Sequence, residues 1–148
     1  MGMKVRSSAL PIGVQAINLS RMYRGSALSA FRDIRLRWTH VVTPSPFGDR
    51  YSIRLTYKVG QRPQVFVTDP NPLSKPAGAD TLPHCYDQTR QRLCLYYPDQ
   101  REWNKSMLLA RTIVPWAYEW LYHYEIWRCN GGNWTGGGIH LGPGPHEI

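Results

Sequence analysis

The sequence predicts an α+β domain in which one helix precedes an antiparallel β-meander and a second, tryptophan-rich helix follows it. Two periodicities carry this prediction. Apolar residues alternate at every second position within residues 34–68, and aromatic residues recur at helical spacing after residue 115. A segment without periodicity separates them, over residues 69–100. A chain of 148 residues fits one domain. We therefore expect residues 1–148 to form a single unit, ending in a glycine-rich tail over residues 131–148.

The first predicted element is a helix within residues 10–31. Apolar residues recur through this segment with good helix formers between them: Leu10, Val14, Ile17, Leu28 and Phe31. Gly25 interrupts the pattern, because glycine is a poor helix former. We expect this helix to pack on the sheet that follows.

Three strands come next, joined by short turns. Residues 34–42 and residues 51–59 alternate apolar with polar or charged side chains, as half-buried strands do. Residues 64–68 form a third, shorter apolar run. Proline, glycine and aspartate mark turns at residues 44–49 and 60–63. Three consecutive strands with short connections make an antiparallel meander.

Residues 69–100 are predicted to form a long irregular loop. Prolines and a glycine are spread through it and oppose regular structure: Pro70, Pro72, Pro76, Gly78, Pro83 and Pro98. A loop of about 30 residues in a small domain is uncommon and is often functional. His84 and Cys94 both lie in this segment.

The C-terminal part predicts helices and an anchored tail. Asn104 can cap a helix that begins at Lys105, and Pro115 suits the first position of a new helix. Aromatic residues then recur at helical spacing and are expected to pack in the core: Trp116, Trp120, Tyr124 and Trp127. Asn130-Gly131 ends that helix, and Trp134 can fix the tail to the domain.

Composition narrows the class of protein. A hydrophobic content of 42% opposes disorder throughout the chain, and a net charge of +8 predicts a basic surface that attracts acidic proteins, nucleic acid or anionic lipid. No apolar run approaches the roughly 20 residues of a membrane span. Residues 1–6 fit neither a signal peptide nor a myristoylation site. The three cysteines lack paired spacing, so we expect a cytoplasmic protein with reduced thiols and no membrane partner.

Cys94 is the candidate nucleophile. It follows His84 by ten residues and lies between Leu93 and Leu95, which would hold its backbone. A thiolate is the best side-chain nucleophile near neutral pH and forms thioesters readily. His84 could orient the loop by hydrogen bonding to the backbone. The alternative is a buried, inert cysteine, which is a common fate of a free thiol.

Two other chemistries use the same residue types. A zinc site could draw four ligands from His84, Cys85, Cys94, Cys129 and His140. None of these residues shows the short Cys-x₂₋₄-Cys spacing typical of structural zinc. A cysteine–histidine hydrolase needs a base beside the thiol, for which the candidates are His84, His123 and His140. No local signature supports either chemistry, and we expect no metal and no cofactor.

The stretch from His84 to Trp103 resembles the active-site region of the ubiquitin-conjugating enzymes. In that family the catalytic cysteine lies ten residues after the histidine of a His-Pro-Asn motif, usually precedes a leucine and is followed shortly by a tryptophan. Here Cys94-Leu95 follows His84, and Trp103 comes shortly after. The order of elements over residues 10–128 also resembles that family. The resemblance implies a ubiquitin-conjugating-enzyme-like fold, with Cys94 as the cysteine that forms a thioester.

The chain departs from the family at two positions of the motif. Cys85 and Tyr86 stand where the family has proline and asparagine. The asparagine amide is usually assigned to steadying the oxyanion or the loop. The hydroxyl of Tyr86 can donate in its place, and a donor of this kind supplies roughly 3 kcal/mol. The expected site is therefore Cys94, His84 and Tyr86. A conjugating fold that binds its partner without catalysis is the alternative.

A closer likeness lies downstream. These segments resemble the conjugating-enzyme-like proteins of bacterial CBASS anti-phage operons: Thr112 to Trp116, Glu119 to Leu121, Tyr124-Glu125, Trp127, Trp134 to Gly138, and His140. In those systems a conjugating-type cysteine handles the C-terminus of a cGAS-like nucleotidyltransferase. The resemblance implies that partner, with a C-terminal glycine, and an acceptor protein or amine. A basic nucleic-acid binder is a third interpretation, but no groove-reading motif supports it.

Overall fold

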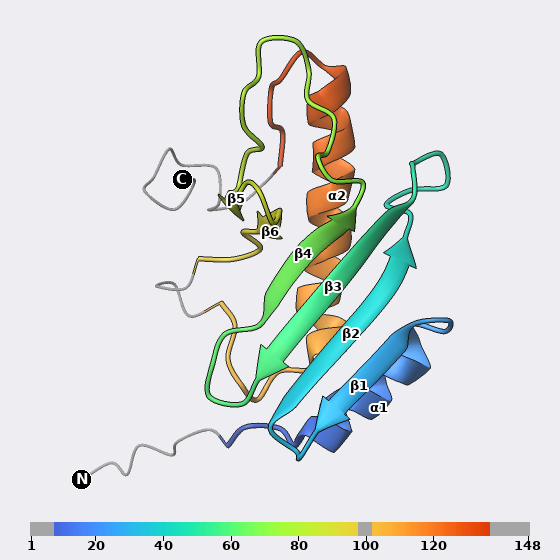
Figure 1. The fold of residues 1–148 in the computed structure, drawn as a ribbon, viewed down its shortest axis with the longest axis vertical. Coiled ribbons are helices and arrows are strands. Elements are labelled where there is room, and N and C mark those ends of the chain that lie inside the picture. Colours follow the sequence, from blue (N-terminus) through green and yellow to red (C-terminus); the bar gives the residue numbers. More distant parts are fainter. Residues whose placement is uncertain (1–7, 98–101, 137–148) are drawn as a thin grey trace, which may run out of the picture.

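A six-stranded antiparallel sheet with two α-helices behind it forms the fold, in the strand order β1-β2-β3-β4-β6-β5 (Figure 1). The computed structural model describes residues 8–97 and 102–136. The elements are α1 (Ile12–Met22), β1 (Ala27–Phe31), β2 (Arg35–Val42), β3 (Tyr51–Lys58), β4 (Gln64–Asp69), β5 (Cys85–Asp87), β6 (Arg92–Leu93), the 3₁₀-helix η2 (Leu109–Arg111) and α2 (Ile113–Cys129). The predicted α+β class is confirmed.

The N-terminal helix is shorter than predicted, and an unpredicted strand follows it. Helix α1 ends at Met22, and Gly25 adopts a positive φ of 84°, a conformation that suits glycine. Strand β1 then pairs with β2 from Ala27 to Phe31. The prediction of one helix over residues 10–31 is therefore wrong in its second half, because Ala27–Phe31 gains a full ladder of backbone hydrogen bonds by joining the sheet edge.

The predicted meander is confirmed in strands β2, β3 and β4. Side chains of β3 alternate between buried and half-buried along its whole length, and Trp38 of β2 is 0% exposed. Strands β2 and β3 pair from Arg35↔Lys58 to Val42↔Tyr51. The inner side chains pack against the helices, and the opposite face of β2 and β3 carries mainly polar and charged side chains. This alternation is the physical source of the sequence pattern.

The segment predicted as an irregular loop contains two short strands. Strand β5 has three residues and β6 has two, and they pair with each other as a hairpin. Strand β6 also pairs with β4 through Phe66↔Arg92, which makes the hairpin the far edge of the sheet. A run of two or three residues is too short to show a periodicity, so the sequence could not reveal these strands.

The C-terminal helix begins after Lys105 and before Pro115, the two starting positions that the sequence predicted. No helix starts at Lys105; Asn104 instead accepts a hydrogen bond from the Ser106 amide at 2.9 Å and closes a turn. Helix α2 begins at Ile113, so Pro115 is its third residue. Proline is tolerated there because the first-turn amides have no acceptor within the helix. The predicted end at Asn130 is confirmed.

Both helices bury one side against the sheet. Seven residues of α2 are buried: Ile113, Val114, Ala117, Trp120, Leu121, Tyr124 and Trp127. The predicted core role of the aromatic stripe is therefore confirmed, although Trp116 is only half-buried. Gln15 of α1 is 0% exposed; its amide donates to the Met107 carbonyl and its oxygen accepts from the Leu109 amide, both at 2.9 Å. Helix α1 is thus joined to the segment that leads into α2.

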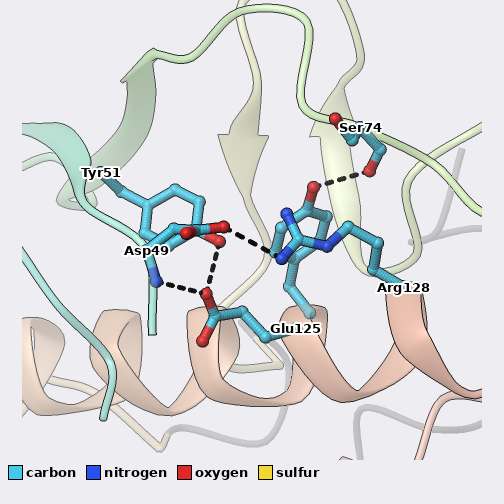
Figure 2. Close-up of polar contacts among 6 residues, drawn as sticks. Asp49, Tyr51, Ser74, Glu125 and Arg128 are labelled. Carbon is cyan, nitrogen blue, oxygen red and sulfur yellow. Dashed lines mark hydrogen bonds and ion pairs between the residues drawn. The ribbon is translucent and has the colours of Figure 1, made fainter. Parts of the chain in front are cut away.

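A polar network fixes the C-terminal end of α2 to the turn before β3 (Figure 2). The Glu125 carboxylate accepts hydrogen bonds from the Asp49 amide and the Tyr51 hydroxyl, each at 2.8 Å. Arg128 pairs with the Asp49 carboxylate at 3.0 Å. Burial and the neighbouring Glu125 raise the pKa of the Tyr51 phenol, so it stays a donor. In the described ranges, no helix has the length and apolar character needed to cross a membrane.

Candidate active site

The β5–β6 hairpin brings the two ends of the His84–Cys94 interval together. The Cys94 amide donates a hydrogen bond to the His84 carbonyl at 2.9 Å, and Cys85 pairs with Leu93 next to it. The ten-residue spacing is therefore the length of one closed hairpin, with His84 and Cys94 facing each other at its base. The sequence predicted that these residues act together, and the structure places them side by side.

Buried glutamine holds the hairpin in position. Gln91 is 1% exposed, and its side chain accepts from the Leu73 amide at 2.7 Å and donates to the Val67 and Pro70 carbonyls at 3.0 Å. Because this side-chain amide makes three hydrogen bonds, burying it costs little free energy. The same bonds fix the position of the strand that follows. Gln91 was not predicted as part of the site. No local pattern in the sequence marks it, because Gln91 lies in a polar stretch between Arg90 and Arg92.

Further hydrogen bonds hold the turn of the hairpin and the segment that leads into β5. The side chain of Gln88 pairs reciprocally with the backbone of Leu82, at 2.8 and 2.9 Å. The Asp87 carboxylate accepts from the Arg90 amide at 2.9 Å. The Asp87 carboxylate thereby holds the turn.

His84 acts on Cys94 through its backbone. Its carbonyl accepts both the Cys94 amide and the indole N–H of Trp120, the latter at 3.0 Å. The residue is 4% exposed and has a positive φ of 47°, which a non-glycine residue rarely adopts. Its ring packs against Trp134 with the centroids 5.2 Å apart. These bonds are made by the His84 carbonyl, so the expected orienting role of the imidazole stays a prediction. The contact with Trp134 fixes the start of the tail.

Cys94 is a buried thiol with polar neighbours. The residue is 5% exposed, and its Sγ lies 3.8 Å from the Tyr96 carbonyl. It does not belong to the main apolar core, whereas its neighbour Cys85 does. Because the Cys94 amide is engaged by His84, that N–H is not available to a negatively charged oxygen formed at the thiol. Another donor would have to supply that stabilisation.

The Tyr86 hydroxyl is the candidate for the donor that would stabilise this oxygen. Burial and, after it, the neighbouring Cys94 thiol raise the pKa of the Tyr86 phenol. The hydroxyl therefore remains protonated at neutral pH and can donate. No nitrogen or oxygen atom of the described residues partners this buried hydroxyl. The Arg92 guanidinium lies 4.7 Å from the centre of the ring and holds it against the hairpin.

Cys85 differs from Cys94 although the two residues lie on paired strands. Cys85 is 0% exposed and packs in the apolar core, and its Sγ lies 3.2 Å from the Asp87 carbonyl. Burial raises the pKa of the Cys85 thiol to about 11, so it carries almost no thiolate at neutral pH. Cys94, by contrast, lies outside the main apolar cluster.

The metal and hydrolase interpretations gain no support. Within residues 8–97 and 102–136, no three His, Cys, Asp or Glu side chains gather as a metal site would require. Cys129 is exposed at the end of α2, and His140 lies outside the described residues. The rings of His84 and His123 both pack against Trp134, and neither contact presents a base to the thiol.

Comparison with known proteins identifies the family. No curated protein matches the sequence. The family model described as "Type II CBASS E2 protein" matches residues 15–141, which include the sheet, the hairpin with Cys94 and helix α2. The match covers most of the chain and implies a ubiquitin-conjugating-enzyme-like fold, in agreement with the architecture. The chain therefore belongs to the Type II CBASS E2 protein family, whose members are the E2-like proteins of CBASS anti-phage defence.

Proposed function

We propose that Cys94 accepts an acyl group as a thioester and passes it to an amine. The donor is the C-terminal glycine of a cGAS-like nucleotidyltransferase, and the acceptor is a protein or small amine. The observation that carries the proposal is the β5–β6 hairpin, which joins the Cys94 amide to the His84 carbonyl at 2.9 Å and carries Tyr86 on the neighbouring strand. Membership of an E2-like family supports the same type of chemistry.

The first half of the reaction is thioester formation. The Cys94 thiolate attacks the carbonyl carbon of the donor glycine, a C–S bond forms, and the activating group leaves with its electron pair. The donor must arrive activated, as a thioester or an acyl phosphate, because a free carboxylate is too poor an electrophile. Tyr86 donates to the oxygen that becomes negative in the tetrahedral intermediate. His84 positions the backbone of Cys94 and touches no substrate.

The second half is transfer to the acceptor. The amine nitrogen attacks the thioester carbonyl, a C–N bond forms, the C–S bond breaks, and the thiolate of Cys94 leaves with the electron pair. The amine releases its proton to solvent. Because Cys94 is only 5% exposed, both steps require the side chains that cover the thiol to shift when the donor arrives. The chemistry is therefore coupled to donor binding.

The test is mass spectrometry of the protein with its nucleotidyltransferase and an activating source. The Cys94→Ser variant should retain a stable oxyester, because a serine ester transfers more slowly to amines. Cys85→Ser serves as the matched control and should form the thioester at Cys94 normally. If neither wild type nor Cys94→Ser carries an adduct under activating conditions, the proposal fails.

The Tyr86→Phe variant tests the oxyanion role separately. Loss of one oxyanion donor typically lowers the rate about 10²- to 10³-fold. Thioester formation should slow by this order while binding of the nucleotidyltransferase stays the same. A rate within about twofold of wild type would remove Tyr86 from the mechanism.

A binding module without catalysis is the second candidate, and the burial of Cys94 favours it. A thiol that is only 5% exposed behaves as a core residue if the side chains that cover it do not move. In that case Cys94→Ala would leave partner binding and phage protection intact. Iodoacetamide labelling separates the two functions. Labelling of Cys94 that rises when the nucleotidyltransferase binds supports the transferase, and a thiol that stays unlabelled with and without partner supports the binding module.

A further inference from the structure

A basic groove lies on the outer face of the sheet, away from the helices. Its volume is about 670 Å³, and its walls come from β1, β2, β3, the turn that leads into β4 and the first residue of β4. The basic, polar and aromatic side chains that line it include Phe31, Arg35, Arg37, Lys58, Arg62 and Gln64. Register places Ser29, Arg37, Thr56 and Gln64 in one row across the four strands. The groove thus crosses the strands on the face that the core does not use.

The charges of the groove are unbalanced. Four cations line it and no carboxylate does, and within the described ranges none of the four is recorded in a salt bridge. Arg35 and Lys58 stand directly opposite each other on β2 and β3. Like charges in this arrangement destabilise a sheet. An anionic ligand would relieve this repulsion, so the groove favours ligands that carry negative charge.

Positive charge continues from the groove to the site. Burial raises the pKa of Tyr96, and two nearby guanidinium groups oppose that rise: Arg62, which lines the groove, and Arg92, in the hairpin. On the same outer face, Phe66 is buried beneath the guanidinium groups of Arg54 and Arg90, at 5.0 and 4.7 Å from its ring centre. A chain lying in the groove therefore has a basic path toward Cys94.

We propose that this groove binds an acidic peptide segment that precedes the C-terminal glycine of the acyl donor. The inference rests on the proposed function, since it assigns a second subsite to the same donor. Strands lie about 4.8 Å apart, so the row from β1 to β4 spans roughly 14 Å, the length of about four extended residues. Ser29, Thr56 and Gln64 offer polar contacts to such a backbone.

The groove suits an acidic peptide better than single-stranded nucleic acid. Nucleic-acid grooves combine cations with aromatic rings on which successive bases stack. Phe31 is the one aromatic side chain among the lining residues with a largely exposed ring, at 58%, and Arg32 already lies 5.2 Å from its centre. Cations without open stacking surfaces favour carboxylates as the ligand.

Binding is measured by fluorescence anisotropy in the Cys94→Ala background, which removes the chemistry. The probe is a fluorescein-labelled, glutamate-rich peptide that ends in glycine, and its glutamine analogue is the neutral control. The double variant Arg37→Glu/Lys58→Glu should weaken binding about tenfold, because each reversal replaces an attraction with a repulsion. Arg24→Glu/Arg111→Glu makes the same change in net charge outside the groove and should change binding less than twofold.

Three results would overturn the proposal. They are no binding of the acidic peptide, an equal loss in both double variants, or tighter groove-dependent binding of a single-stranded oligodeoxynucleotide at the same salt concentration. Circular dichroism of each variant checks that the fold is retained.

A parallel assay separates this subsite from the chemistry at Cys94. Adduct formation is followed in the protein with Cys94 intact, at a donor concentration below saturation. The groove reversal should lower the adduct yield about tenfold. Groove binding without any adduct in the wild type rejects the chemistry and leaves the groove, whereas an adduct that is insensitive to the groove reversal rejects the groove alone.

Discussion

The β2–β3–β4 meander and the β5–β6 hairpin belong to one sheet but are stabilised differently. The meander is held by long ladders and by alternating side chains that pack against α1 and α2. The hairpin has five residues in its strands and depends on individual polar contacts from Gln91, Gln88 and Trp120. Burial of apolar area therefore supports the framework, and single hydrogen bonds set the geometry of the site.

The strongest test of this difference removes a side chain from the core of the meander. Trp38→Ala should lower the free energy of unfolding by about 3–5 kcal/mol, because Trp38 is 0% exposed and its loss leaves a large cavity. Urea denaturation measures the change. Val41→Ala on the same strand, where the side chain is 46% exposed, should cost less than about 0.5 kcal/mol. Similar losses at both positions would contradict the proposed role of inward packing.

A substitution at Gln91 should affect the hairpin more than the meander. Gln91→Leu leaves the buried Leu73 amide without its acceptor, which typically costs about 1–3 kcal/mol. Hydrogen exchange at the Cys94 amide should accelerate by more than exchange at Leu55 in β3. Gln61→Leu is the matched control, since Gln61 is exposed in a turn. Equal acceleration at both amides would show that the two regions unfold as one unit.

A smaller effect is expected from the indole of Trp120. Trp120→Phe removes the N–H that bonds the His84 carbonyl, a loss of about 1 kcal/mol beyond the change in packing. Trp127→Phe makes the same reduction in volume on the same helix. Exchange of the Cys94 amide should rise about fivefold more in Trp120→Phe than in Trp127→Phe. Identical exchange in the two variants would mean that this hydrogen bond does not hold the hairpin.

The smallest predicted effect is a pH dependence in the meander. Burial lowers the pKa of His40 in the folded state, so the unfolded chain binds the proton more readily. Its contribution to stability is complete above the unfolded pKa of about 6.5 and decreases as the pH falls below that value. Urea midpoints of wild type and His40→Gln, compared at about pH 7.5 and about pH 5, should show a shallower decrease in the variant. Parallel curves would exclude His40 as the titrating group.

The same physical difference explains how far the sequence could be used for prediction. Strands β2 to β4 and the aromatic stripe of α2 follow periodic burial, which a sequence displays directly. Strand β1 was assigned to a helix because Leu28 and Phe31 suit either element, and pairing with β2 decides between them. The start of α2 at Ile113 was missed because proline is tolerated throughout a first turn.

The candidate site was predicted mainly from the resemblance to the ubiquitin-conjugating enzymes, and less from the physical properties of its residues. The spacing from His84 to Cys94 identified the two residues, and the structure adds that a hydrogen bond joins them. The roles of Gln91 and Trp120 depend on contacts across 18 to 36 positions in the chain, which no local pattern records. Catalysis by Cys94, with support from Tyr86, stays a prediction until the adduct is measured.

The bond from Trp120 to the His84 carbonyl has a practical consequence. One of the six tryptophans is tied directly to the backbone that holds Cys94. An indole that loses a buried hydrogen-bond acceptor changes its emission, so intrinsic fluorescence reports on the hairpin without any label. A protein that keeps only Trp120, with the other tryptophans replaced by phenylalanine where folding allows, would display opening of the site in real time when a partner binds.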